Sequence, residues 1–166
     1  LHIITEFQRF YPHGSHACHT IGYLSAFDQT GMMGLEKLFE DSLKGAPGEL
    51  TRTVAASGRD LELLLTQNPL PGESIQTTLD SEIQEIAERV FPSDKSGVIM
   101  LMHARTGALE VLLSYPGFDP NTFLGTISAE EWNELNKGKP FINRACLAYP
   151  PASLFKLVTI TAALEE

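Results

Sequence analysis

The spacing of apolar residues in the first half of the chain predicts a mixture of short helices and short strands. Between residues 31 and 43 apolar side chains recur every three or four positions, which predicts a helix with Gly45 at its C-terminal cap. Three short strands are predicted at 20–24, 51–56 and 61–65, the last two joined by a turn at Ser57-Gly58-Arg59.

The clearest break in this pattern is Asn68-Pro69-Leu70-Pro71-Gly72, where we place a domain boundary. Beyond it the pattern predicts a strand at 75–79, a helix from Asp80 to Val90 with Ile83, Ile86, Ala87 and Val90 on one face, a β-hairpin of 98–103 with 109–114, a capped helix at 128–135 and a helix at 153–166. The sequence thus predicts an α+β fold in two parts, residues 1–72 and 73–166.

Composition and charge exclude several classes of protein. The 166 residues are 43% hydrophobic and 20% charged, which is typical of a folded domain and excludes a disordered acidic tail. Twelve basic residues face 21 acidic ones without a basic patch, so we expect no nucleic-acid partner. The longest aliphatic run, 98–102, is far too short to cross a bilayer. The chain begins with Leu and shows no signal peptide, so we expect it to be a piece of a longer or processed protein.

The cysteines and histidines offer a weaker chemical signal. Two cysteines 128 residues apart, Cys18 and Cys146, form no disulfide framework, and whether they pair stays open. His13, His16, Cys18 and His19 lie close together and are residue types that bind zinc, but their spacing matches no closed four-ligand pattern. We therefore expect a structural role for this cluster and no metal or cofactor.

The sharpest chemical signal is Ser153-Leu154-Phe155-Lys156, the only Ser-x-x-Lys in the chain. Residues i and i+3 share one helix face, so the Lys156 ammonium can reach the Ser153 hydroxyl. A serine becomes a strong nucleophile once a base takes its proton, and lysine can be that base where burial lowers its pKa. The apolar neighbours of Lys156 predict such a buried environment.

Several further motifs stand in order before this serine, and together they resemble the class B penicillin-binding proteins. They include Arg9-Phe10-Tyr11-Pro12, His19-Thr20-Ile21-Gly22-Tyr23, Lys44-Gly45-Ala46-Pro47-Gly48, Thr78-Leu79-Asp80-Ser81, Ser114-Tyr115-Pro116-Gly117-Phe118-Asp119-Pro120-Asn121 and Tyr149-Pro150-Pro151. The resemblance covers essentially the whole chain. Tyr-Pro-Pro before the serine is most similar to the elongation-type members of that family.

The resemblance implies a peptidoglycan D,D-transpeptidase. Ser153 would be the acylated nucleophile and Lys156 its base, with the stem peptide ending in D-Ala-D-Ala as substrate and β-lactams as acylating inhibitors. Residues 1–72 would belong to a pedestal domain, and 73–166 would begin the transpeptidase domain. The implied partners are a SEDS-type glycosyltransferase and other elongation proteins. The implied location is the periplasmic face of the cytoplasmic membrane, with an N-terminal membrane anchor missing from these residues.

The sequence also departs from the family pattern. The family carries Ser-x-Asn and Lys-Ser/Thr-Gly motifs after the nucleophile; the chain has no Ser-x-Asn, and Lys95-Ser96-Gly97 lies 58 residues before Ser153, where an ordinary turn is expected. We therefore expect the chain by itself to lack activity. Two alternatives stay open: a non-catalytic pedestal or interaction module, and a β-lactam sensor or serine β-lactamase.

Overall fold

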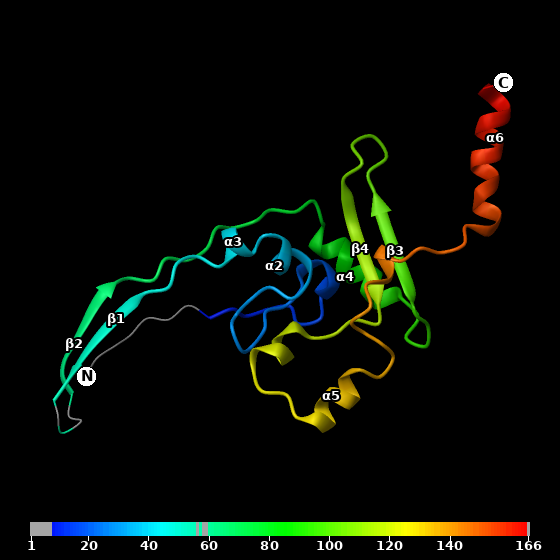
Figure 1. The fold of residues 1–166 in the computed structure, drawn as a ribbon. Helices are drawn as coiled ribbons and strands as arrows, with labels where there is room; N and C mark the ends of the chain where they lie inside the picture. The colour runs from blue at the N-terminus through cyan, green and yellow to red at the C-terminus, as the bar shows by residue number, and fades with distance from the viewer. Residues whose placement is uncertain (1–7, 56, 58–59, 166) are drawn as a thin grey trace.

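The computed structural model describes residues 8–55, 57 and 60–165 of the chain. Figure 1 shows a central body with two extensions, a long β-hairpin on one side and the last helix, α6, on the other. The body contains segments from both predicted parts of the chain. The architecture is α+β, as the sequence predicts.

The long hairpin consists of β1 (Glu49–Val54) and β2 (Asp60–Gln67). The strands pair antiparallel, with Leu50 opposite Leu65, and a bridge between Ala46 and Leu70 closes the hairpin at its base. The two predicted strands are therefore confirmed. Part of the turn predicted at 57–59 lies outside the described residues.

The strand predicted at 20–24 is wrong, because most of that stretch lies in or next to the short helix α1 (Cys18–Ile21). The amides of Thr20 and Ile21 both donate to the Ala17 carbonyl, 2.9 Å away, and Gly22 ends the turn with a φ of 84°. A side chain at Gly22 would collide with the Met33 carbonyl, so the chain can turn here only with glycine. Within this stretch only Leu24 forms a β-type pairing, an isolated antiparallel bridge to Gly31.

The helix predicted at 31–43 is present as two short helices, α2 (Gly34–Leu38) and α3 (Glu40–Leu43). They are separated at Phe39, whose φ of −117° and ψ of 29° leave the helical range. Gly45 follows the C-cap residue Lys44 with a φ of 67°, which is the position predicted for a glycine cap.

A second hairpin, β3 (Gly97–Met102) with β4 (Leu109–Tyr115), packs against α4 (Ser81–Val90). Both the hairpin and the Asp80 cap of α4 are confirmed, since the Asp80 carboxylate accepts from the amides of Glu82 and Ile83 at 3.0 Å. The strand predicted at 75–79 is absent. Instead of a strand ladder, two hydrogen bonds to backbone carbonyls of β4 hold this segment, one from the Asp80 amide and one from the Thr78 hydroxyl.

The predicted apolar face of α4 is only partly correct. Ala87 is buried, but Ile83, Ile86 and Val90 are exposed, while Gln84 is 1% exposed. Gln84 points toward β4, where its side-chain oxygen accepts from the Leu112 amide at 2.9 Å. The inward face of α4 therefore combines this polar pairing with the buried side chain of Ala87, which packs on β4.

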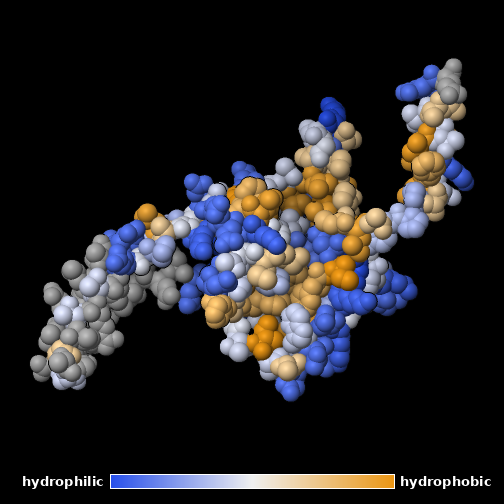
Figure 2. Space-filling view, in the orientation of Figure 1, coloured by the Kyte–Doolittle hydropathy of each residue, from blue (hydrophilic) through white to orange (hydrophobic). Residues whose placement is uncertain are grey.

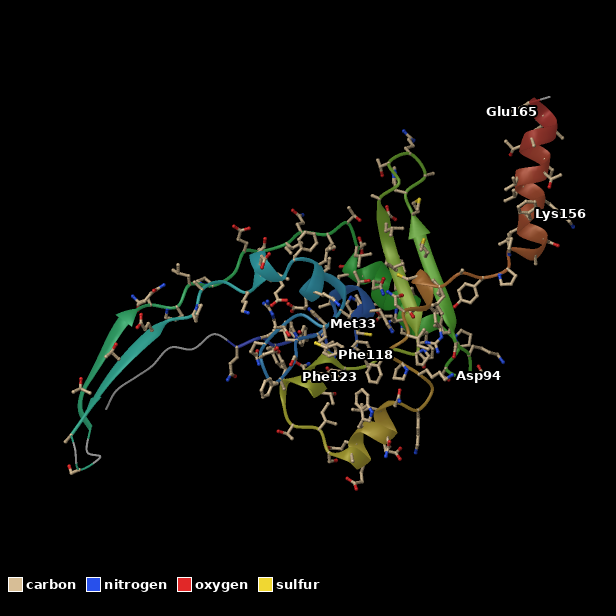
Figure 3. The ribbon with its side chains drawn as sticks, viewed as in Figure 1. Met33, Asp94, Phe118, Phe123, Lys156 and Glu165 are labelled. Atoms are coloured by element: carbon tan, nitrogen blue, oxygen red, sulfur yellow. The ribbon has the colours of Figure 1, made fainter. Side chains whose placement is uncertain are left out.

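An apolar core joins the N-terminal region to the segment that follows β4. Cys18, Phe118 and Phe123 are buried together, and Tyr23, Met33, Ile127 and Phe141 pack around them. Figure 3 shows Met33, Phe118 and Phe123 pointing toward one another. This core places α1 beside the loop that follows β4, so residues about 100 positions apart meet.

The last part of the chain runs over this core and then leaves it. A 3-10 turn at Pro120–Leu124 (η1) leads to α5 (Ala129–Leu135), whose predicted capping box between Ser128 and Glu131 is present. A second 3-10 turn, η2 (Arg144–Cys146), packs on β3 and β4. The chain then reaches η3 (Ala152–Leu154) and α6 (Phe155–Glu165). Among the described residues, none of the helices combines the length and apolar character that crossing a bilayer requires.

Candidate active site

Ser153 and Lys156 lie where the chain passes from η3 into α6. Ser153 is the middle residue of η3 and Lys156 is the second residue of α6. The Leu154 amide donates to the Pro151 carbonyl at 2.9 Å, so Pro151 opens the turn that carries the serine. Both side chains are exposed, and no hydrogen bond joins them or ties either to another described residue. The three-residue spacing nevertheless places them on adjacent positions of one helical turn.

The buried environment predicted for Lys156 is wrong for this structure. Phe155, Leu157, Val158 and Ile160 are between 56% and 67% exposed. Figures 1 and 2 show α6 standing apart from the central body with apolar side chains along it. Helical periodicity places apolar residues around Lys156, but only a second packed element can remove water from them, and no described element covers them.

Lys95 and Ser96 lie in an exposed turn, and Gly97 is the first residue of β3. The Lys95 amide donates to the Pro92 carbonyl at 3.1 Å, and the Lys95 ammonium lies 3.0 Å from the Asp94 carboxylate. In Figure 3, Asp94 lies well away from Lys156. The structure therefore does not bring this tripeptide to Ser153, in agreement with its interpretation as an ordinary turn.

His16, Cys18 and His19 of the cluster near the N-terminus each contact a different residue elsewhere in the chain. His16 Nδ1 lies 3.0 Å from the Glu88 carboxylate, and His19 Nε2 lies 2.6 Å from the Pro140 carbonyl oxygen. Cys18 Sγ accepts from the Phe118 amide at 3.4 Å. Within residues 8–55, 57 and 60–165, no group of three His, Cys, Asp or Glu side chains has an arrangement that could hold a metal ion. Both cysteines are free thiols; Cys18 is buried and Cys146 is exposed.

Burial shifts the protonation of two members of this cluster. Loss of hydration raises the pKa of the Cys18 thiol to about 11 and lowers the pKa of His19 below its usual value. The Cys18 thiol is therefore protonated near neutral pH, which makes it a weak nucleophile, and the His19 imidazole is neutral. Both shifts favour a structural role for this cluster.

A cavity of about 300 Å³ lies between α1, α4 and the end of β4. Ser15, Cys18, Gln84, Glu88 and Ser114 are among its lining residues. Glu88 accepts there from the Ala17 amide at 2.9 Å and from the Gln84 side-chain amide at 2.8 Å. Sequence reasoning missed Gln84 and Glu88, because a glutamine or glutamate on an amphipathic helix is normally a solvated residue.

Asn121 is another residue whose role sequence reasoning missed. Its side-chain amide donates to the Tyr11 carbonyl at 2.8 Å, and its side-chain oxygen accepts from the Tyr11 amide at 3.0 Å. The Tyr11 hydroxyl in turn donates to the buried carboxylate of Glu36, which also pairs with Arg9. Asp119 caps η1, whereas Asn121 ties the start of η1 to the N-terminal region.

Comparison with known protein families matches two regions of the chain. Residues 1–77 match the penicillin-binding protein dimerisation domain, and residues 97–166 match the penicillin-binding protein transpeptidase domain. The two regions occur in the same order as the two predicted parts of the sequence.

Individual relatives agree with these matches. The peptidoglycan D,D-transpeptidase MrdA of Escherichia coli K12 is 32% identical over 181 aligned residues, which cover 95% of this chain and 28% of MrdA. The stage V sporulation protein D of Bacillus subtilis is 31% identical over 95% of this chain and 24% of its own length. The chain thus spans about a quarter of the length of these relatives.

Solved structures give the same result. Penicillin-binding protein 2 of Helicobacter pylori superposes with a TM-score of 0.74 at 29% identity, covering 95% of this chain and 33% of that one. A second structure is a complex of the Helicobacter pylori penicillin-binding protein 2 with MreC. It superposes with a TM-score of 0.73 at 32% identity, covering 95% and 32% of the two chains.

Proposed function

The chain belongs to the penicillin-binding proteins, and we propose that it is part of a peptidoglycan D,D-transpeptidase of cell-wall elongation. The observation that carries this proposal is the order of the two matched regions, with Ser153 and Lys156 at the end of the second. The similarity to MrdA and to a penicillin-binding protein 2 favours the elongation type. The division at residues 72 and 73 is part of the same proposal, supported by the extended segment between β2 and α4.

In the proposed reaction Ser153 is the nucleophile and Lys156 is the general base. Lys156 takes the proton as Ser153 Oγ bonds to the carbonyl carbon of the penultimate D-alanine. The peptide bond breaks, and the terminal D-alanine leaves with a proton on its amine. An amine of a neighbouring strand then attacks the ester and regenerates the serine. The backbone amide of Ser153 would be one donor to the oxyanion, and loss of such a donor in related reactions costs about 2.7–4 kcal/mol.

Partners and location follow from the same proposal. The substrate is a stem peptide ending in D-Ala-D-Ala, and β-lactams acylate the same serine. A SEDS-type glycosyltransferase of the elongation machinery is the proposed protein partner, and the Helicobacter pylori complex adds an MreC-type protein. We propose the periplasmic face of the cytoplasmic membrane as the site of action, because the substrate is assembled into the wall there.

The test is covalent labelling with a fluorescent penicillin of the natural polypeptide that contains this sequence. We expect one labelled peptide, containing Ser153, and loss of the label in Ser153→Ala. Lys156→Ala should slow labelling by about 10²- to 10⁴-fold, the usual contribution of a general base. Ser96→Ala is the matched control, because Ser96 belongs to the Lys-Ser-Gly turn, and it should label normally.

The outcomes separate the alternative functions. Labelling that persists in Ser153→Ala would contradict the assignment of the nucleophile. Rapid turnover of nitrocefin by the natural polypeptide would favour a β-lactamase over a transpeptidase. Labelling of neither the natural polypeptide nor the 166-residue chain would favour a non-catalytic interaction module.

A further inference from the structure

His19 connects α1 to a segment more than 100 residues further along the chain. Its side chain is buried, with Nε2 2.6 Å from the Pro140 carbonyl oxygen and Nδ1 3.5 Å from Cys18 Sγ. Its ring and that of Phe118 form a T-shaped pair, with centroids 5.4 Å apart. Neither proposed catalytic group uses this histidine.

The chemistry of its partners assigns the protons. A carbonyl oxygen can only accept, so His19 Nε2 carries the hydrogen that is donated to Pro140. In a neutral ring Nδ1 is then an acceptor, and the Cys18 thiol is its donor. Cys18 Sγ in turn accepts from the Phe118 amide. Burial lowers the pKa of His19 and raises that of Cys18, which favours these protonation states.

The segment that His19 holds leads directly toward Ser153. Two residues after Pro140, the Ile142 carbonyl accepts from the Ser114 hydroxyl at 3.2 Å, and the Arg144 amide donates to the same hydroxyl at 2.9 Å. η2 then packs on the β3–β4 hairpin. The segment 140–146, which we call the anchor segment, is therefore fixed by His19 at its start and by Ser114 in its middle. Ser153 follows seven residues after it ends.

We propose that His19 is a positioning residue that, through Pro140, fixes the anchor segment from which the chain departs toward Ser153. This inference rests on the proposed transpeptidase function for its effect on the reaction. The Nε2–H tautomer is required, because only that form donates to Pro140. Cys18 selects the tautomer by donating to Nδ1. Packing in the N-terminal region thereby sets the starting point of the stretch that carries the nucleophile.

The experiment compares His19→Ala, His19→Gln and Cys18→Ala in the natural polypeptide. Glutamine places an N–H donor near the position of Nε2, so it should retain the bond to Pro140. His13→Ala is the matched control, because His13 is exposed and precedes α1. Two quantities are measured on each variant: hydrogen exchange of the amides in 140–147, and the rate constant of acylation by a fluorescent penicillin.

In His19→Ala we expect these amides to exchange at least about tenfold faster, while those of the β3–β4 hairpin stay protected. Acylation should slow by about 10- to 100-fold, the usual cost of a small misplacement of a reacting group. His19→Gln should restore most of both quantities, and His13→Ala should change neither. Cys18→Ala should accelerate exchange about two- to tenfold, the equivalent of one net hydrogen bond.

Each of the two measurements can contradict the proposal independently of the other. Unchanged exchange in 140–147 in both His19→Ala and Cys18→Ala would overturn the anchor proposal, whatever the labelling result. Equal acylation rates for wild type and His19→Ala would also overturn it. If His19→Ala also unfolds the β3–β4 hairpin, the comparison moves to the other two variants. The amides in 140–147 should then exchange more slowly in His19→Gln than in Cys18→Ala, and the reverse order refutes the proposal. If the wild-type protein is not labelled by the fluorescent penicillin, the proposed function is contradicted. The exchange data then still test whether His19 fixes the anchor segment.

Discussion

Glu88 is the residue whose loss tests most directly how α4 is joined to the N-terminal region. Its carboxylate accepts from three groups: the Ala17 amide at 2.9 Å, the Gln84 side-chain amide at 2.8 Å and His16 Nδ1 at 3.0 Å. The side chain is 23% exposed, so solvent reaches it only in part. Replacement by alanine removes all three acceptor contacts without altering the apolar core.

The expected loss of stability is dominated by the Ala17 amide. Ala17 is buried, and an unsatisfied buried donor costs about 1–3 kcal/mol. Gln84 can still donate weakly to the Leu112 carbonyl, 3.5 Å away, and His16 is near enough to the surface to turn toward water. We therefore expect Glu88→Ala to lower the free energy of unfolding by about 2–3 kcal/mol. Glu88→Gln keeps an acceptor for Ala17 but loses the charge, and it should cost about 1 kcal/mol.

The measurement is urea unfolding at neutral pH, with Glu85→Ala as the matched control. Glu85 lies on the exposed side of α4, so its replacement should change the unfolding free energy by no more than about 0.5 kcal/mol. The reasoning is refuted if Glu88→Ala and Glu85→Ala agree within that margin. A double-mutant cycle with His16→Ala then separates the His16 contact from the Ala17 contact.

Three further predictions concern other contacts of the core. Asn121→Ala should lower the unfolding free energy by about 1–3 kcal/mol, because it removes both hydrogen bonds to the Tyr11 backbone. Asn121→Asp can only accept, so its unfolding free energy in the same urea titration should lie between those of Asn121→Ala and wild type. At pH 8 a thiol reagent should modify Cys146 rapidly and Cys18 only as the protein unfolds. Mass spectrometry of the modified peptides measures both rates, and equal rates for the two cysteines would contradict this prediction. The raised pKa of Cys18 means that the folded state holds this proton more tightly than the unfolded state. Stability linked to it is therefore complete below about pH 8.5 and falls as the pH rises toward about 11, and Cys18→Ala should flatten that slope.

Local patterns in the sequence predicted the elements whose causes are themselves local. The β3–β4 hairpin, the Asp80 and Ser128 caps and the glycine cap after α3 depend on residues a few positions apart. The Ser-x-x-Lys spacing is local as well, so the sequence alone singled out Ser153 and Lys156. Their role as catalytic residues stays a prediction.

Two predictions about local structure were wrong because a distant contact overrode the local pattern. Residues 20–24 contain β-branched and aromatic residues typical of a strand, but Gly22 packs against the Met33 backbone and the chain forms α1 instead. The apolar periodicity of α4 pointed to Ile83 and Ile86, but Gln84 turns inward because the Leu112 amide needs a partner.

The sequence by itself determined the fold class, the order of the two matched regions and the position of the nucleophile pattern. The tertiary structure alone decided which polar side chains leave water and what they bind: Glu88 with Ala17, Asn121 with Tyr11, and His19 with Pro140. The physical reason is that each of these contacts joins residues 71 to 121 positions apart. No periodicity within one helix or strand encodes such a pairing, which forms only once the apolar core has brought the segments together.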